Sequence, residues 1–179
     1  YTRTTVSELA GRASVITKAK EFNIELSNED AKKLIEEVQN LEHQGFQFEA
    51  ADGSLFLLMN KIKGLSPDYF DFESFRVFSE RRNSENVVSE AVCKINVKDQ
   101  RYVTTGEGVG PVDALSKALV GGLRNDYPDI EVVKLIDYKV RIIDSTDGTE
   151  ATTRVLIEFT DGKRKWNTVG VHQNIINAS

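Results

Sequence analysis

Gly106, Gly108 and Gly110, followed by Pro111, form the segment of this chain whose residue types best suit a chemical role. Proline fits the first position of a helix, because its φ is already helical and its missing N–H would have no partner there. Glycines lack a side chain, so another group can come close to the backbone N–H groups around them. The segment predicts an exposed helix N-terminus, a structure that binds carboxylates or phosphates.

The same pattern occurs a second time in the chain. Residues 166–178 repeat residues 102–114 at an offset of about 64 residues. The matching pairs are Tyr102 with Trp166, Thr104 with Thr168, Gly106 with Gly170, Val112 with Ile176, Asp113 with Asn177 and Ala114 with Ala178. This self-similarity predicts an internal duplication, and each copy ends in a turn that leads into a helix. Val171, His172 and Asn174 fall in the second turn.

The glycine turn has more than one interpretation. Spaced glycines also occur in dinucleotide-binding loops, but those loops follow a strand of a parallel βαβ unit, whereas the strand expected here belongs to an antiparallel meander. A tight strand-to-helix turn without a ligand and a site for a small carboxylate both stay open. Asp113, at the third helical position, either complements the helix dipole or binds an ammonium group.

Residues suited to catalysis or metal binding are few. His43 and His172 lie in different segments, without Cys or carboxylate residues at ligand spacing. Cys93 is the one cysteine, which excludes an internal disulfide, and its apolar strand face predicts a buried thiol. The chain has no Ser-His-Asp order, nucleophile elbow or paired-carboxylate cleft. The sequence therefore predicts neither a catalytic residue nor a metal site.

The composition is that of an ordinary folded protein, with 179 residues, of which 40% are hydrophobic and 28% charged. A net charge of −5 argues against a nucleic-acid partner, which would favour a basic face. The chain has no apolar run of the roughly 20 residues that a membrane helix needs. Its first residues do not resemble a leader peptide, so a cytoplasmic location is expected.

Residues 1–64 have the spacing of helices. Ser27 followed by Asp30 resembles a capping box, and apolar residues then recur on one helical face until Gly45. Other helices are expected at about residues 12–22 and in the segment that ends at Gly64. Three short helices bury little apolar surface alone, so we expect them to pack on a domain that this chain lacks or on a partner domain.

From Tyr69 onward the apolar period changes from 3.6 to 2, which indicates strands. Residues 87–97, 138–142 and 153–159 alternate in this way, and the Asp-Gly pairs at 147–148 and 161–162 predict two-residue hairpin turns. The fold class is therefore α+β. The expected organisation is a helical subdomain (residues 1–64) and a domain (residues 69–179) of two βββα repeats with antiparallel sheets, at 69–125 and 130–179.

Several stretches resemble one known family. Residues 105–114, 135–138 and 154–157 resemble the C-terminal regulatory domain of the α-isopropylmalate synthase and citramalate synthase family, and residues 6–12 and 41–49 resemble its linker. The resemblance covers nearly the whole chain and is closer to citramalate synthases, as residues 168–179 also indicate. Tyr1 and Ser179 are accordingly expected to be cuts in a larger polypeptide.

The resemblance implies a parent acyltransferase that condenses acetyl-CoA with a 2-oxo acid in a metal-dependent barrel. This chain would bind the end product, inhibit the enzyme and form a homodimer. Pyruvate and isoleucine are the acceptor and effector of a citramalate synthase; 2-oxoisovalerate and leucine are those of an isopropylmalate synthase. The barrel is absent here, so the divalent metal and acetyl-CoA are not expected to bind this chain, and the fragment itself is not expected to be an enzyme. A purely structural dimerisation module is the alternative.

The resemblance also assigns effector contacts. The turn residues beside the effector's polar end are Gly106, Gly108, Gly110, Val112 and Asp113. Leu135, Tyr138 and Ile142 correspond to a strand that lines the apolar part of the pocket, and Val155 is a further wall. The second turn contributes Val171, His172 and Asn174.

Overall fold

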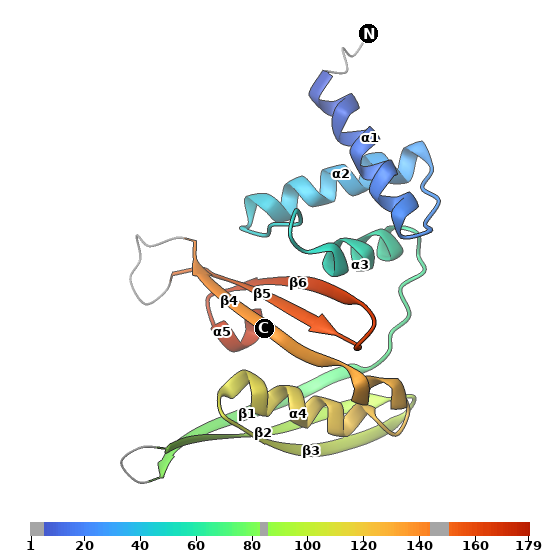
Figure 1. Ribbon diagram of the computed structural model, residues 1–179. Helices are drawn as coiled ribbons and strands as arrows, with labels where there is room; N and C mark the ends of the chain where they lie inside the picture. The colour runs from blue at the N-terminus through green and yellow to red at the C-terminus, as the bar shows by residue number, and fades with distance from the viewer. Residues whose placement is uncertain (1–5, 83–85, 144–150) are drawn as a thin grey trace. The chain divides into compact units, whose positions relative to one another are not determined.

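The computed structural model describes residues 6–82, 86–143 and 151–179 as three helices followed by two sheets of three strands, each with its own helix (Figure 1). In chain order the elements are α1 (Val6–Glu21), α2 (Asn28–His43), α3 (Asp52–Ile62), β1 (Asp71–Arg82), β2 (Asn86–Val97), β3 (Gln100–Gly108), α4 (Pro111–Leu123), the 3-10 helix η1 (Pro128–Val132), β4 (Lys134–Ile142), β5 (Thr153–Thr160), β6 (Lys165–His172) and α5 (Ile175–Ala178). The α+β class and the two βββα repeats are confirmed.

Helix α2 begins and ends where the sequence indicates, whereas α1 begins at Val6, earlier than the expected start at about residue 12. The Ser27 hydroxyl accepts the N–H of Asp30 at 3.0 Å and donates to the Asp30 carboxylate at 2.8 Å, so it caps α2. Gly45, just after α2, has a φ of +103°, which favours glycine. His43 bonds the carbonyl of Gln39 at 2.6 Å, and thus stabilises the end of α2.

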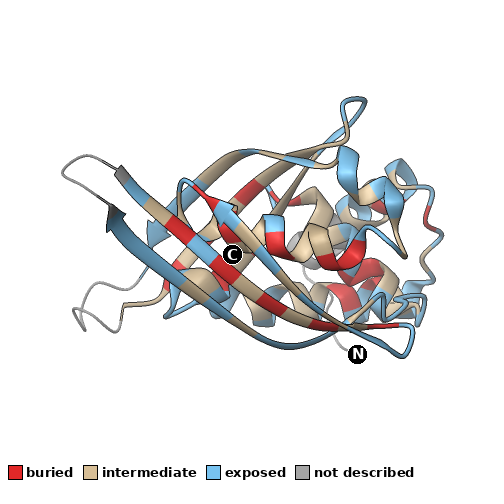
Figure 2. Ribbon diagram, turned by 90° about the horizontal axis from the view of Figure 1, so that it is seen from below, coloured by how far each residue is buried: buried red, intermediate tan, exposed pale blue. Residues whose placement is uncertain are grey.

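The first sheet has the order β1-β2-β3 with antiparallel pairing. Alternate residues of the central strand are buried, namely Ser89, Ala91, Cys93, Ile95 and Val97. Figure 2 shows that buried and exposed positions alternate along the strands. Helix α4 covers this face with Ala114, Ala118 and Leu123, which form one apolar core with the four apolar residues of β2. The thiol of Cys93 is buried as predicted, and this burial raises its pKa.

The hairpin turns differ from the prediction. The connection between β2 and β3 is a two-residue turn in which Lys98 and Asp99 have φ values of 46° and 68°. No glycine marks it, so the sequence pattern missed it. Between Thr160 and Lys165 the predicted hairpin exists, but its connection is four residues long. The predicted turn at 147–148 lies outside the described residues.

The side chain of Asp161 stabilises the four-residue connection between β5 and β6. The carboxylate of Asp161 accepts the N–H groups of Lys163 at 2.8 Å and Arg164 at 2.6 Å. These two donors, Arg164 first, lower the pKa of Asp161, because they stabilise its charged form. An Asp side chain that bonds backbone N–H groups two and three residues on forms a turn without needing positive φ at its own position.

The second sheet, in the order β4-β5-β6, repeats the burial pattern of the first. Thr153, Val155 and Ile157 of β5 are buried, at the offset of about 64 residues from Ser89, Ala91 and Cys93. The duplication therefore extends from the glycine turns to the cores. Val155 and Ile157 point away from the face that carries Leu156, because side chains alternate along a strand.

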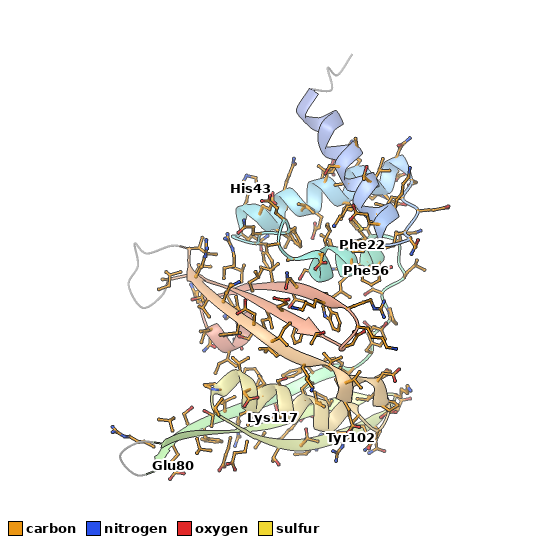
Figure 3. The ribbon with its side chains drawn as sticks, in the orientation of Figure 1. Phe22, His43, Phe56, Glu80, Tyr102 and Lys117 are labelled. Carbon is orange, nitrogen blue, oxygen red and sulfur yellow. The ribbon has the colours of Figure 1, made fainter. Side chains whose placement is uncertain are left out.

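The N-terminal helices pack on this second sheet. Their apolar core includes Val169 of β6 as a buried member and Leu156 of β5 as a partly buried one. Phe22, just after α1, and Phe56 of α3 meet edge to face with ring centroids 5.6 Å apart (Figure 3). The sequence does not indicate this packing partner, since strand alternation does not show which element covers a face.

The described chain divides into two compact units. One contains the described parts of residues 1–66 and 136–158 together with residues 165–179; the other contains the described parts of residues 67–135 together with residues 159–164. The bounds of the helical subdomain and of the two-repeat domain, as given by the sequence, stay a prediction. Within the described residues, none of the helices has the length and apolar character needed to span a membrane.

Candidate functional site

Helix α4 begins as the sequence predicts. Pro111 occupies the first turn, and Gly110 is the N-cap residue with an extended φ of −157°. A Cβ atom on Gly110 would meet nothing within 4 Å, so this position is open. Because glycine has no side-chain acceptor, it cannot cap the first N–H groups of the helix, and those groups carry the positive end of the helix dipole.

The other two glycines serve a different purpose. A Cβ on Gly106 would lie 2.3 Å from the carbonyl oxygen of Ala114 and 2.5 Å from the amide nitrogen of Ala118. A Cβ on Gly108 would lie 2.5 Å from the carboxylate of Asp113. Both positions are therefore filled by α4 itself, which rests directly on β3. The close approach that these glycines permit is that of a helix.

The second repeat has the same helix-to-strand contact. A Cβ on Gly170 would lie 1.9 Å from the carbonyl oxygen of Ala178, the counterpart of Ala114. The N-cap differs, however, because the Asn174 side chain accepts the N–H groups of Ile176 at 2.9 Å and Asn177 at 3.3 Å. The second turn thus has a side-chain cap, and the first, with Gly110, does not.

His172 also belongs to this local structure. Its Nδ1 atom accepts the N–H of Asn174 at 2.9 Å, so the ring holds the turn that precedes α5. Val171 packs against the end of α2, since a Cβ on Gly45 would lie 3.5 Å from a methyl group of Val171. All three residues of the second turn, Val171, His172 and Asn174, therefore have structural contacts.

Asp113 lies at the start of α4 and already has two partners. Its carboxylate accepts the N–H of Val109 at 3.1 Å and the ammonium group of Lys117 at 2.9 Å. Lys117 also donates to the carbonyl of Glu107 at 3.0 Å, so it ties the turn to the helix (Figure 3 labels Lys117). Lys117 lies outside the predicted site residues, although its spacing of four from Asp113 is a recognisable ion-pair signal.

The predicted apolar residues of β4 have different environments. Tyr138 is half-buried, and its hydroxyl lies 2.9 Å from the hydroxyl of Ser179. Ile142 is 67% exposed, which leaves an apolar side chain open to solvent. Beside Tyr138, Asp137 pairs with Lys139 at 2.8 Å. That hydrogen bond lowers the pKa of Asp137 and raises the pKa of Lys139, because it favours both charged forms.

The predicted site residues form separate groups. Gly106, Gly108, Gly110, Val112 and Asp113 come together in one turn, in the same compact unit as the half-buried Leu135. The other six belong to the compact unit that contains the N-terminal helices: Tyr138, Ile142, Val155, Val171, His172 and Asn174. Val155 is fully buried at 0% exposure, as part of the core of its sheet. The effector-contact set stays a prediction.

Among the described residues, no group of three or more His, Cys, Asp and Glu side chains is arranged to hold a metal ion. The absence of a metal or cofactor in this chain stays a prediction.

The fold can now be assigned to a family. Residues 49–179 match the family described as the LeuA allosteric (dimerisation) domain. This match covers most of the chain, including both repeats and the uncapped turn, and the chain belongs to that family.

Three similar relatives are named (R)-citramalate synthase. The chain is 48% identical to the (R)-citramalate synthase of Aquifex aeolicus over 178 residues, 43% identical to that of Streptomyces coelicolor over 180 and 41% identical to that of Geobacter sulfurreducens over 181. Each alignment includes 98% or 99% of this chain but 34% of the relative. The chain therefore spans about a third of the length of these curated relatives.

Proposed function

We propose that this chain is the regulatory part of a citramalate synthase, an acyltransferase that joins acetyl-CoA and pyruvate, and that it binds isoleucine and inhibits the enzyme. One observation carries the proposal: a chain of the allosteric dimerisation family is similar over almost its full length to enzymes named (R)-citramalate synthase. In this proposal the regulatory part also forms a homodimer.

The proposed polar contact is the N-terminus of α4. Gly110 leaves the first N–H groups without a side-chain cap, and its Cβ position is open, so a carboxylate can approach. The ammonium group of the amino acid would bind the partly exposed Asp113 carboxylate and displace Lys117 from it. In the second turn, Asn174 takes the position of such a ligand carboxylate. The first turn is therefore the better candidate.

The apolar contact is assigned to Leu135, Tyr138 and Ile142 by the family resemblance, and this assignment is part of the proposal. Burial of a branched aliphatic side chain contributes roughly 1.5 to 3 kcal/mol. Isoleucine and leucine differ in the position of one methyl group, so pocket shape would separate them by about 1 to 3 kcal/mol.

Isothermal titration of this chain with isoleucine, leucine and valine tests the proposal. We expect isoleucine to bind with the highest affinity. Preference for leucine would instead support the regulatory domain of a 2-isopropylmalate synthase. The absence of binding heat with all three, together with a dimer in sedimentation, would favour a purely structural dimerisation module and contradict the sensor.

Replacement of Tyr138 by alanine tests the apolar contact. The substitution removes the aromatic ring, so the affinity for isoleucine should fall about tenfold or more, in line with the loss of roughly 1.5 kcal/mol of apolar burial. Tyr138→Phe is the matched control, because it keeps the ring and removes only the bond to Ser179. Titration compares the three proteins, and equal affinity of Tyr138→Ala and wild type would place the pocket elsewhere.

A further inference from the structure

Helix α3 lies against the outer edge of the second sheet (Figure 1). Strand β6 is last in the order β4-β5-β6, so one edge of its backbone has no neighbouring strand within the sheet. Backbone N–H groups at such an edge need other acceptors or water. The first turn of α3 supplies acceptors for two of them.

Two side chains make these bonds in regular spacing. The carboxylate of Asp52 accepts the N–H of Asn167 at 2.9 Å, and the hydroxyl of Ser54 accepts the N–H of Val169 at 2.9 Å. The acceptors are two residues apart on the helix, and the donors are two residues apart on the strand. Asp52 also accepts the N–H of Gly53 at 2.9 Å, which keeps its carboxylate in position.

Gly53 lets the helix come this close. A Cβ on Gly53 would lie 2.8 Å from the carbonyl oxygen of Asn167 and 3.1 Å from the ring of Trp166. The backbone of α3 therefore rests on the backbone of β6, with no side chain between them. The three consecutive residues 52–54 form what we call the edge clamp.

A second pair of hydrogen bonds joins the N-terminal helices to the second sheet, through its central strand β5. The guanidinium of Arg154 in β5 donates to the carbonyl of Gly45 and to the side-chain oxygen of Gln47, the latter at 3.0 Å. Gly45 and Gln47 lie in the connection between α2 and α3. Below these polar bonds, Val169 and Leu156 share the apolar core of the helices.

We propose that the edge clamp makes the helical segment and the second repeat move as one body, so that a displacement of the β4–β6 sheet is transmitted to the helices. The clamp bonds two short side chains of α3 to the backbone of β6, and at Gly53 the two backbones meet directly, which leaves little freedom to absorb a shift. Packed interfaces of this kind change between discrete arrangements and deform little within each one. The regulatory consequence rests on the proposed function: the effect of effector binding would be transmitted to the rest of the synthase through the edge clamp.

Native-state hydrogen exchange on this chain tests directly whether the edge clamp joins α3 to the sheet. In the wild type, the amides of residues 55–62 and 165–171 should exchange through one common opening, with the same dependence on denaturant. In the double variant Asp52→Ala, Ser54→Ala, residues 55–62 should exchange at least about tenfold faster than residues 153–159, whose protection should persist. Separate openings in the wild type, or unchanged protection of α3 in the variant, would overturn the inference.

Three further variants separate the clamp from a general loss of helix stability. Ser27→Ala removes a cap from α2 but no contact to the sheet, so faster exchange should be confined to α2. Asp52→Asn keeps a side-chain oxygen and should behave like the wild type. Gly53→Ala keeps both acceptors but introduces the close contact with Asn167, so it should release α3 as the double variant does.

Inhibition of the synthase that contains this chain tests the regulatory consequence. With the double variant, isoleucine should bind with unchanged affinity, but saturating isoleucine should inhibit the synthase at least about tenfold less than in the wild type. If wild type and variant are inhibited alike, transmission through the clamp is refuted while the proposed function stands. If the wild type binds no amino acid, the proposed function fails, and the exchange experiment alone decides the clamp.

Discussion

Gly106→Ala is expected to lower the free energy of unfolding of the first repeat by about 3 kcal/mol, the upper part of the range for overpacked sites. The single added carbon would lie 2.3 Å from the carbonyl oxygen of Ala114 and 2.5 Å from the amide nitrogen of Ala118. Both atoms belong to the backbone of α4, so no side-chain rotation can relieve the contact. The helix must move off β3 and open the core around Ala114 and Ala118.

Urea unfolding followed by circular dichroism measures this effect. Gly121→Ala is the matched control, because its Cβ would be 3.8 Å from the nearest atom, Cβ of Thr104, an ordinary contact. Within α4 that change should stabilise the protein by about 0.5 to 1 kcal/mol, since alanine is the better helix former. A loss of less than about 1 kcal/mol for Gly106→Ala would show that α4 does not rest on this strand as described.

Gly110→Val is expected to abolish effector binding while the protein stays folded. The backbone at Gly110 is extended, a conformation that valine adopts readily, and its Cβ would meet no atom within 4 Å. The two methyl groups would occupy the approach to the uncapped N–H groups of α4. We expect the affinity for isoleucine to fall at least about a hundredfold, which corresponds to about 2.7 kcal/mol.

Titration with isoleucine and urea unfolding on the same preparation separate the two effects. Val109→Ala is the control in the same turn, because Val109 is 89% exposed and its truncation should change neither quantity. If Gly110→Val binds isoleucine as tightly as the wild type, the N-terminus of α4 is not the carboxylate site.

These two glycines are four residues apart, and the sequence pattern treats them alike. Gly106 is required because a helix occupies the space where its side chain would be, whereas the same space at Gly110 is empty. The difference assigns the first glycine to folding and leaves the last available for a ligand. A turn with a built-in side-chain acceptor, such as the one at Asn174, has no such vacancy at its helix N-terminus.

The sequence by itself determined what depends on neighbouring residues. Apolar period identified the helices and strands, Ser27 and Asp30 marked the start of α2, and the offset of about 64 residues showed the duplication. These features are predictable because a cap bond spans three residues and strand alternation is a property of one segment. The same local signals failed at Lys98 and Asp99, where two residues with ordinary preferences adopt positive φ to close a tight hairpin.

Only the tertiary structure decided which elements touch. The bonds from Asp52 to Asn167 and from Ser54 to Val169 each join residues 115 positions apart, and no spacing in the sequence indicates them. The helix that fills the space over Gly106 is likewise invisible in the glycine pattern. The physical reason is that long-range packing is selected by the combined burial of many side chains, whereas periods, caps and turns are selected by the few residues that form them.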